Sequence, residues 1–162
     1  MDENCVYVDK YFKVSIPNHP FNSREDGGHL VLTLHNPVTD RSDLTVEQAI
    51  NFMRVTMMVG RAMYDVLGVK RMNYEDLGNS DPRLHLHFFG RAHKQLYQVP
   101  GFPIALIWPK GHPIYTSGIF DPLSQDEIDR LRDRVKELSR DEKYVRMAQL
   151  AGIEDEDSKN CK

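Results

Sequence analysis

Residues 83–89, which read RLHLHFF, decide the fold of this chain more than any other stretch. Their alternation between two kinds of side chain has the period of two that is typical of a β-strand. The pattern places side chains on two opposite faces: Leu84, Leu86 and Phe88 on one, and Arg83, His85, His87 and Phe89 on the other. Neighbours on one face lie about 7 Å apart, because two residues of strand rise separate them. The apolar face can pack beneath a helix, which leaves the nitrogen-bearing side chains on the exposed face.

A long helix that could cover the apolar face is predicted upstream, over residues 45–67. Thr45 and Gln48 have the spacing of a capping box, and Gly68 is suited to the left-handed conformation that ends many helices. Apolar residues recur at helical spacing between these limits. Further strands are predicted over residues 29–34, 69–77 and 104–108, separated by turn-forming segments such as 17–28 and 78–82.

The C-terminal part of the chain is predicted to be helical. Ser124 and Glu127 form a second capping-box pattern, and Ser139 and Glu142 form a third that restarts the helix. We therefore expect three regions: a domain over 1–123, a helical extension over 124–151 packed on the same domain, and a disordered acidic tail over 152–162. Strands interleaved with helices and joined by short loops predict an α+β fold with an antiparallel sheet.

Composition and charge narrow the class of protein. The 162 residues are 40% hydrophobic, as expected for one compact domain, and their net charge of −3 argues against a nucleic-acid binder. No apolar run reaches the roughly 18 residues that cross a bilayer, and the polar N-terminus does not resemble a signal peptide. Cys5 and Cys161 lie near opposite ends, a spacing that fits neither a disulfide framework nor a metal-binding pair. We therefore predict reduced thiols, no membrane contact and a cytoplasmic location.

Three interpretations of the His85 and His87 pair are open at this point. They can be solvated surface side chains, or they can share a metal ion as ligands at i and i+2 of a strand. Residues 88–120 contain no Asp or Glu, so a third metal ligand would have to come from elsewhere. The third interpretation is phosphorus chemistry. A neutral imidazole is a competent nucleophile near neutral pH, and its neighbour can donate to phosphate oxygens.

These residues resemble the histidine triad (HIT) superfamily. Its signature is His-φ-His-φ-His-φ-φ, where φ is apolar, and it follows a Gly-His-φ-φ-φ strand and a long helix. Here residues 28–32 read GHLVL, the predicted helix follows, and residues 83–91 read RLHLHFFGR. The resemblance covers residues 15–101 in order and spacing, and HLHFFGRA is especially similar to the Hint-type pattern.

The resemblance implies a fold, an activity and partners. The fold is an antiparallel sheet with a packed helix, paired into a homodimer with a continuous sheet. Members hydrolyse or transfer nucleotides from phosphoramidates, dinucleoside polyphosphates or adenylylated substrates. The middle histidine attacks the α-phosphate and forms a nucleotidyl-histidine intermediate. The resemblance therefore implies a purine nucleotide (AMP-like) as substrate, with no metal and no other cofactor.

Residue by residue, the resemblance implies that His85 is the nucleophile and that His87 donates to the transferring phosphate and the leaving group. His29 corresponds to the fourth histidine, which supports the triad. The resemblance implies contacts to nucleotide or phosphate for Asn18, Asn73 and Ser80. Residue chemistry adds Asn79, in a predicted turn whose backbone N–H groups can hold an anion, and the Arg83 guanidinium. The base and ribose are expected to lie against apolar side chains of the 29–34 strand and the long helix.

The first triad position departs from the family pattern, because it is Arg83 rather than histidine. An arginine donates hydrogen bonds and does not accept them. If it turns toward His85, its charge lowers the pKa of that imidazole. It could also bind a phosphate in bidentate fashion. A retuned HIT enzyme, a catalytically impaired nucleotide-binding module and a metal-binding protein therefore stay open as functions.

Overall fold

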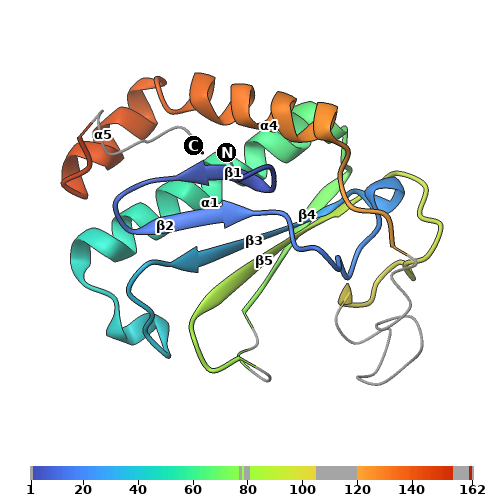
Figure 1. Cartoon of the computed structure of the whole chain (residues 1–162), viewed down its shortest axis with the longest axis horizontal. Coiled ribbons are helices and arrows are strands. Elements are labelled where there is room, and N and C mark those ends of the chain that lie inside the picture. Colours follow the sequence, from blue (N-terminus) through green and yellow to red (C-terminus); the bar gives the residue numbers. More distant parts are fainter. Residues whose placement is uncertain (1, 77, 79–80, 105–119, 155–160, 162) are drawn as a thin grey trace.

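The computed structural model describes residues 2–76, 78, 81–104, 120–154 and 161. Five strands form one antiparallel sheet in the order β1-β2-β3-β5-β4, so β1 and β4 lie at its edges (Figure 1). The strands are β1 Cys5–Val8, β2 Phe12–Ser15, β3 His29–Leu34, β4 Arg71–Glu75 and β5 His85–Arg91. The helices are α1 Val46–Leu67, α4 Gln125–Leu138 and α5 Glu142–Leu150, with short 3-10 turns at Arg24–Asp26 and Arg41–Asp43. The predicted α+β fold with an antiparallel sheet is confirmed.

Helix α1 begins and ends where the sequence predicts. The Thr45 hydroxyl accepts from the backbone N–H of Gln48, and the Gln48 side chain accepts from the N–H of Thr45. At the other end Gly68 has a φ of +62° and donates its N–H to the carbonyl of Tyr64. Both caps satisfy backbone groups that a helix leaves unpaired at its ends.

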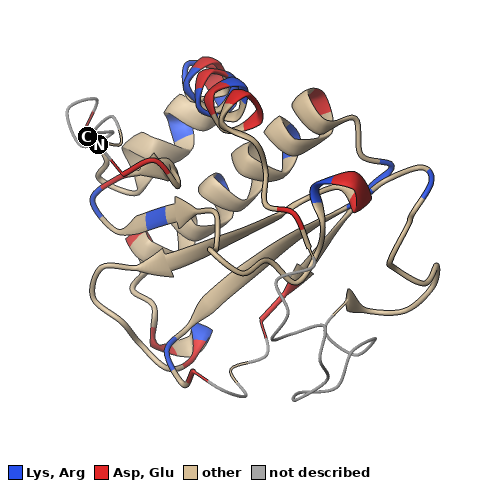
Figure 2. Cartoon of the chain, turned by 45° about the vertical axis from the view of Figure 1, so that its right-hand side comes forward, with Lys and Arg blue, Asp and Glu red and all other residues tan. Residues whose placement is uncertain are grey.

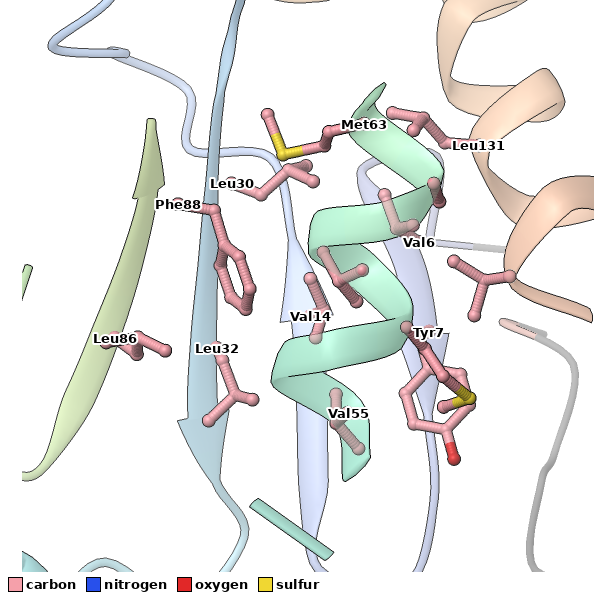
Figure 3. Packing of buried hydrophobic residues seen from close by; sticks show 14 of the residues in the cluster. Val6, Tyr7, Val14, Leu30, Leu32, Val55, Met63, Leu86, Phe88 and Leu131 are labelled. Carbon is pink, nitrogen blue, oxygen red and sulfur yellow. The ribbon is translucent and has the colours of Figure 1, made fainter. Parts of the chain in front are cut away.

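The core lies between the sheet and α1. Figure 3 shows Leu30 and Leu32 of β3 and Leu86 and Phe88 of β5 pointing toward this helix, and the exposed fraction of each is at most 1%. Leu131 of α4 approaches α1 from the other side (Figure 3). Helix α1 therefore packs on one face of the sheet, and the predicted division of residues 83–89 into two faces follows from this packing.

The C-terminal helices pack on α1, and α4 carries interspersed positive and negative residues on its outer surface (Figure 2). A buried polar network holds α5 in place. The Arg54 guanidinium of α1 donates to the Tyr144 carbonyl of α5 at 3.1 Å and to the Tyr7 hydroxyl at 2.9 Å. It also faces the buried carboxylate of Asp9 at 3.7 Å. The charge of Arg54 is thus paired inside the protein, as burial requires.

Some local predictions differ from the structure. Strands β1 and β2 have four residues each, too few for a periodic pattern to predict them. The third capping box is wrong, because Ser139 closes α4 in helical geometry and Asp141 is the N-cap of α5. Of the predicted strand 104–108, only Ile104 lies within the described residues.

The prediction of two reduced thiols is wrong. Cys5 and Cys161 form a disulfide, with Cα atoms 5.6 Å apart. Although 156 residues separate them in sequence, the fold brings Cys161 back to β1, a strand that α4 also contacts. Arg132 of α4 donates to the carbonyls of Cys5 and Glu3 at 2.6 and 2.8 Å. The cytoplasmic location stays a prediction, without the support of reduced thiols. None of the helices in the described part of the chain has the length and hydropathy to cross a bilayer.

Candidate functional site

The face of the sheet opposite α1 brings three histidines together. In the β3–β5 pairing, Val31 lies opposite His87 and Thr33 lies opposite His85. His29, at the start of β3, lies opposite Phe89. Because paired residues of antiparallel strands share a face, His29, His85 and His87 point to the same side. Their ring centroids lie 4.8 Å apart for His85 and His87, and 5.1 Å apart for His29 and His87.

The partner of His85 assigns the position of its proton. Its Nδ1 lies 2.7 Å from the backbone carbonyl oxygen of Arg83. A carbonyl can only accept, so Nδ1 carries the hydrogen and donates it. The lone pair of a neutral imidazole then belongs to Nε2. The His85 ring is only half-buried, so this geometry leaves a nucleophilic nitrogen on the histidine face.

A second chain of hydrogen bonds assigns the protons of His29 and His87. The backbone N–H of Phe21 donates to Nδ1 of His29 at 3.1 Å, so this nitrogen is an acceptor. Nε2 of His29 must then carry the hydrogen, and it donates to Nδ1 of His87 at 2.9 Å. In the neutral His87 imidazole the remaining hydrogen is on Nε2. His87 therefore presents a donor beside the acceptor nitrogen of His85.

Burial keeps the imidazoles of His29 and His87 neutral. Burial and the neighbouring His87 hold the pKa of His29 well below its usual range. Burial, followed by the charge of His85, lowers the pKa of His87 to about 4, and Asp76 opposes the shift. Aromatic rings account for the dry surroundings, because Phe21 and Phe89 pack against both imidazoles with centroids 4.4–5.9 Å away. At neutral pH His87 is thus a hydrogen-bond donor without a charge.

Glycines allow the backbone approach that positions His29. Gly27 and Gly28 have φ values of +120° and +79°, which favour glycine. A Cβ on Gly90 of β5 would lie 2.0 Å from the carbonyl oxygen of Gly27. The buried Asn22 side chain ties the contact by donating to the carbonyls of Gly28 and Gly90 at 3.0 and 2.8 Å. The turn before β3 is thus held against the end of β5.

A buried carboxylate and a buried guanidinium hold the loop that follows β5. The Asp26 carboxylate accepts three consecutive backbone N–H groups, those of residues 96–98, at 2.5–2.9 Å. The Arg91 guanidinium donates to the carbonyls of Val99 and Phe102, at 2.9 Å each. Sequence reasoning missed both residues. The alternation of β5, which puts Arg91 on the histidine face, was the one available signal for Arg91.

The Arg83 side chain is directed to Asp81. Its guanidinium donates from Nε and Nη2 to the Asp81 carboxylate, the latter at 2.6 Å, and it is largely exposed. These hydrogen bonds hold the pKa of Asp81 well below its usual range. Arg83 therefore contacts His85 through its backbone carbonyl, and the assignment of the His85 proton does not depend on the side chain at position 83.

The other predicted nucleotide contacts are placed unequally. Asn73 of β4 pairs with Phe89 and so shares the histidine face. The Asn18 side chain accepts from Asn4 at 2.9 Å, beside β1 rather than beside the histidines. Asn79 and Ser80 lie outside the described residues. Glu75, which pairs with His87 across β4 and β5, was missed, although the alternation from Asn73 could have indicated it.

Two further expectations concern the surroundings of the histidines. Helix α1 packs on the opposite face of the sheet, and the expected contact of a base with apolar side chains of this helix stays a prediction. Apolar groups on the histidine side are Phe21, Val31 and Phe89. Within the described residues, no group of three His, Cys, Asp or Glu side chains is placed to hold a metal ion.

Solved structures with this fold are histidine triad proteins. No family model and no curated protein matches the sequence. A histidine triad protein of Bradyrhizobium japonicum has a TM-score of 0.58 at 21% identity, over 82% of this chain and 92% of that one. A hypothetical histidine triad nucleotide-binding protein of Sulfolobus tokodaii has a TM-score of 0.57 at 14% identity, over 85% of this chain and 86% of that one. The diadenosine triphosphate hydrolase of Plasmodium falciparum has a TM-score of 0.53 at 14% identity, over 85% and 79%. The chain thus has the HIT fold that its residues resemble.

Proposed function

We propose that this chain is a nucleotide hydrolase or transferase of the histidine triad type. Its substrate is a nucleoside phosphoramidate, a dinucleoside polyphosphate or an adenylylated molecule, and its partner is an AMP-like purine nucleotide. The observation that carries the proposal is the proton arrangement of the three histidines. It pairs an acceptor nitrogen on His85 with a donor on His87, as attack on a phosphate ester requires. The named neighbours, a nucleotide-binding protein and a diadenosine triphosphate hydrolase, support it.

The reaction begins with attack by His85. The Nε2 lone pair forms a bond to the α-phosphorus, and the bond from phosphorus to the leaving group breaks. The leaving group departs with the electron pair of that bond and takes a proton from solvent. The imidazole becomes cationic, and its Nδ1–H donates more strongly to the Arg83 carbonyl. The oxygen of water or of another acceptor then forms a bond to the phosphorus and loses a proton. The N–P bond breaks, and its electron pair returns to Nε2 of His85.

His87 acts as a hydrogen-bond donor rather than as an acid. With a pKa of about 4 it is neutral at physiological pH, and loss of its Nε2 proton would leave an imidazolate. Its Nε2–H therefore stabilises charge on a phosphate oxygen, and His29 keeps this hydrogen in place. Arg83, Asn73, Asn79 and Ser80 are proposed as further contacts to the nucleotide. Asn18 is the least supported of the predicted contacts, because it lies beside Asn4.

A homodimer in the cytoplasm belongs to the same proposal. Strand β4 is an edge strand, and its Tyr74 is 45% exposed. On the adjoining α1, Met53 and Tyr64 are 51% and 38% exposed. Large exposed apolar groups beside a free strand edge are typical of an interface. Sedimentation that finds only the monomer mass at micromolar concentration would contradict the dimer.

The second candidate is a module that binds a nucleotide without turning it over. The observation that favours it is the Arg83 side chain, which occupies the first triad position and is bound to Asp81. The imidazole that the family has at this position is therefore absent from the site. This module would bind AMP in a saturable manner and would never form a covalent adduct.

Intact mass spectrometry after mixing with an adenosine phosphoramidate tests the enzyme against the module. We expect a transient mass increase of one adenylyl group on the wild-type protein, and none on His85→Ala. His35→Ala is a matched control, because His35 lies at the far end of β3 and bonds to the carbonyl of Asp9. Unchanged turnover in His85→Ala would remove the proposed mechanism. Saturable AMP binding without any adduct would favour the module.

A further inference from the structure

The β4 side of the histidine site carries a carboxylate that is held in place. Glu75 pairs with His87 in the β4–β5 register, so the two side chains share a face with Cβ atoms about 5 Å apart. Oε1 of Glu75 accepts from the backbone N–H of Ile104 at 3.2 Å. Ile104 is only 1% exposed, so the carboxylate is bonded to a buried part of the protein.

Glu75 differs from the two acidic residues around it. Asp76 forms an ion pair with Arg41 at 2.8 Å, and Asp81 forms one with Arg83 at 2.6 Å. Within the described residues, no lysine, arginine or histidine forms an ion pair with Glu75. Its negative charge is therefore the one at the histidine site that no described side chain neutralises by direct contact.

Arg91 is the cation that could compensate for this charge, and it is engaged elsewhere. It interacts electrostatically with Glu75. Its guanidinium, however, donates to Gln95 and to the carbonyls of Val99 and Phe102. These bonds shape the loop after β5, so the guanidinium is not free to turn to Glu75.

The two sides of the histidine row thus differ in character. On the β3 side the row is bordered by Val31, and Phe21 and Phe89 stack around His29 and His87. These apolar and aromatic groups suit a nucleoside base. On the β4 side lie Asn73 and Glu75. A substrate with its nucleoside on the β3 side places its leaving group on the β4 side, beside the Glu75 carboxylate.

We propose that Glu75 selects substrates whose leaving group carries a positive charge. The inference rests on the proposed function and narrows its substrate class to nucleoside phosphoramidates of amines that bear a second, protonated amine. When the P–N bond breaks, the departing nitrogen keeps the electron pair, and it takes two protons from solvent in all, which make it an ammonium. The Glu75 carboxylate attracts the second, protonated amine of the substrate throughout the step. A dinucleoside polyphosphate instead releases a nucleoside diphosphate, whose negative charges Glu75 repels.

Two AMP amides of matched shape test the inference. The monoamide of cadaverine ends in an ammonium group, and the amide of hexylamine ends in a methyl group of similar size. With wild-type protein we expect kcat/KM to be about tenfold higher for the cadaverine amide. In Glu75→Gln this ratio should fall to within about twofold, and turnover of diadenosine triphosphate should rise by about threefold or more.

The variants are chosen so that folding does not obscure the result. The amide oxygen of Glu75→Gln can still accept from Ile104, so the fold and the position of the side chain are kept. Glu137→Gln makes the same change in net charge on the outer surface of α4, where this side chain is 70% exposed. It should leave the cadaverine-to-hexylamine ratio at its wild-type value.

The outcomes separate the inference from the proposed function. Equal kcat/KM for the two amides in the wild type, with an adduct on His85, overturns the role of Glu75 and leaves the function standing. An equal loss for all substrates in Glu75→Gln also overturns it, because a positioning role alone would give that result. The absence of an adduct with every substrate removes the proposed function itself.

Discussion

At the scale of single residues, backbone groups determine how the candidate nucleophile is protonated. Nδ1 of His85 donates its hydrogen to the carbonyl oxygen of Arg83. Nδ1 of His29 accepts from the backbone N–H of Phe21, so the hydrogen of His29 is on Nε2. Because these are backbone groups, the side chain at position 83 does not change which nitrogen of His85 is free. This explains how the departure from the family pattern is compatible with an acceptor nitrogen at the site.

Removing the donor on His29 should weaken catalysis through His87. In His29→Phe the ring volume is kept, but Nδ1 of His87 loses its donor, and the hydrogen of the neutral ring can move to that nitrogen. We expect adduct formation to slow by about tenfold or more, since a lost oriented donor is costly in a dry site. Stopped-flow measurement of the adduct tests this rate. NMR shifts of the His87 ring nitrogens should report the change of tautomer, and an unchanged tautomer would contradict the relay.

His29 and His87, whose pKa values burial lowers, should also make stability depend on pH. Burial lowers the pKa of His87 to about 4, while the unfolded value is about 6.5. The unfolded state therefore binds more protons between these values. The stabilisation is fully present above about pH 6.5 and is lost as pH falls toward 4, with about 2 kcal/mol lost for His87 by about pH 5. Urea unfolding at several pH values measures the slope, and His87→Gln should show a smaller slope than the wild type.

At the scale of elements, the site depends on how closely the turn before β3 approaches β5. The carbonyl of Gly28 accepts from the N–H of Gly90 at 3.1 Å, and Asn22 bridges the same two residues. This contact sets the position at which β3 begins and hence the position of His29. In the sequence, the pair Gly27 and Gly28 indicates a turn at this place. The residue that the turn contacts, Gly90, lies 62 residues after Gly28.

A methyl group at position 90 should disturb this junction. In Gly90→Ala the new Cβ would lie 2.0 Å from the Gly27 oxygen, a backbone atom that can move away only if the turn shifts. We expect a loss of about 1–3 kcal/mol in the free energy of unfolding, together with slower adduct formation. Gly68→Ala is the comparison, because nothing lies within 4 Å of its Cβ and only its φ of +62° is unfavourable. An equal loss of activity in both variants would contradict the junction's role.

At the scale of the whole molecule, the C-terminal helices stabilise the sheet from the side opposite the histidines. Helices α4 and α5 pack on α1, α4 also contacts the edge strand β1, and Arg54 connects α1 with α5 and with the buried Asp9. The extension therefore stabilises the domain without lining the site. Its charged outer surface (Figure 2) is typical of a solvated helix face.

Loss of the buried arginine should destabilise the molecule strongly. Arg54→Leu leaves the Asp9 carboxylate buried without its cation and removes the bond to Tyr144. We expect the free energy of unfolding to fall by about 3–5 kcal/mol. Arg61→Leu on the same helix should cost no more than about 1 kcal/mol, because Arg61 is 60% exposed. Urea denaturation measures both, and similar losses in the two variants would contradict a structural role for the network.

The sequence by itself determined the elements that carry a local signal. Both ends of α1 have caps formed by residues close in sequence. The alternation of residues 83–89 assigns each side chain to a face of the strand without reference to the rest of the chain. The resemblance to the HIT pattern predicted the fold for the same reason, since its motif lies within single strands. His29, His85 and His87 could therefore be singled out in advance.

Tertiary structure alone decided the partners of those residues. The pairing of Glu75 with His87, the bond from Phe21 to His29 and the Cys5–Cys161 disulfide join residues whose separation in sequence says nothing about distance. The direction of Arg83 toward Asp81 likewise depends on side-chain rotamers that no pattern records. Local propensity acts over a few residues, whereas proton positions and charge balance at a site depend on every strand that meets there.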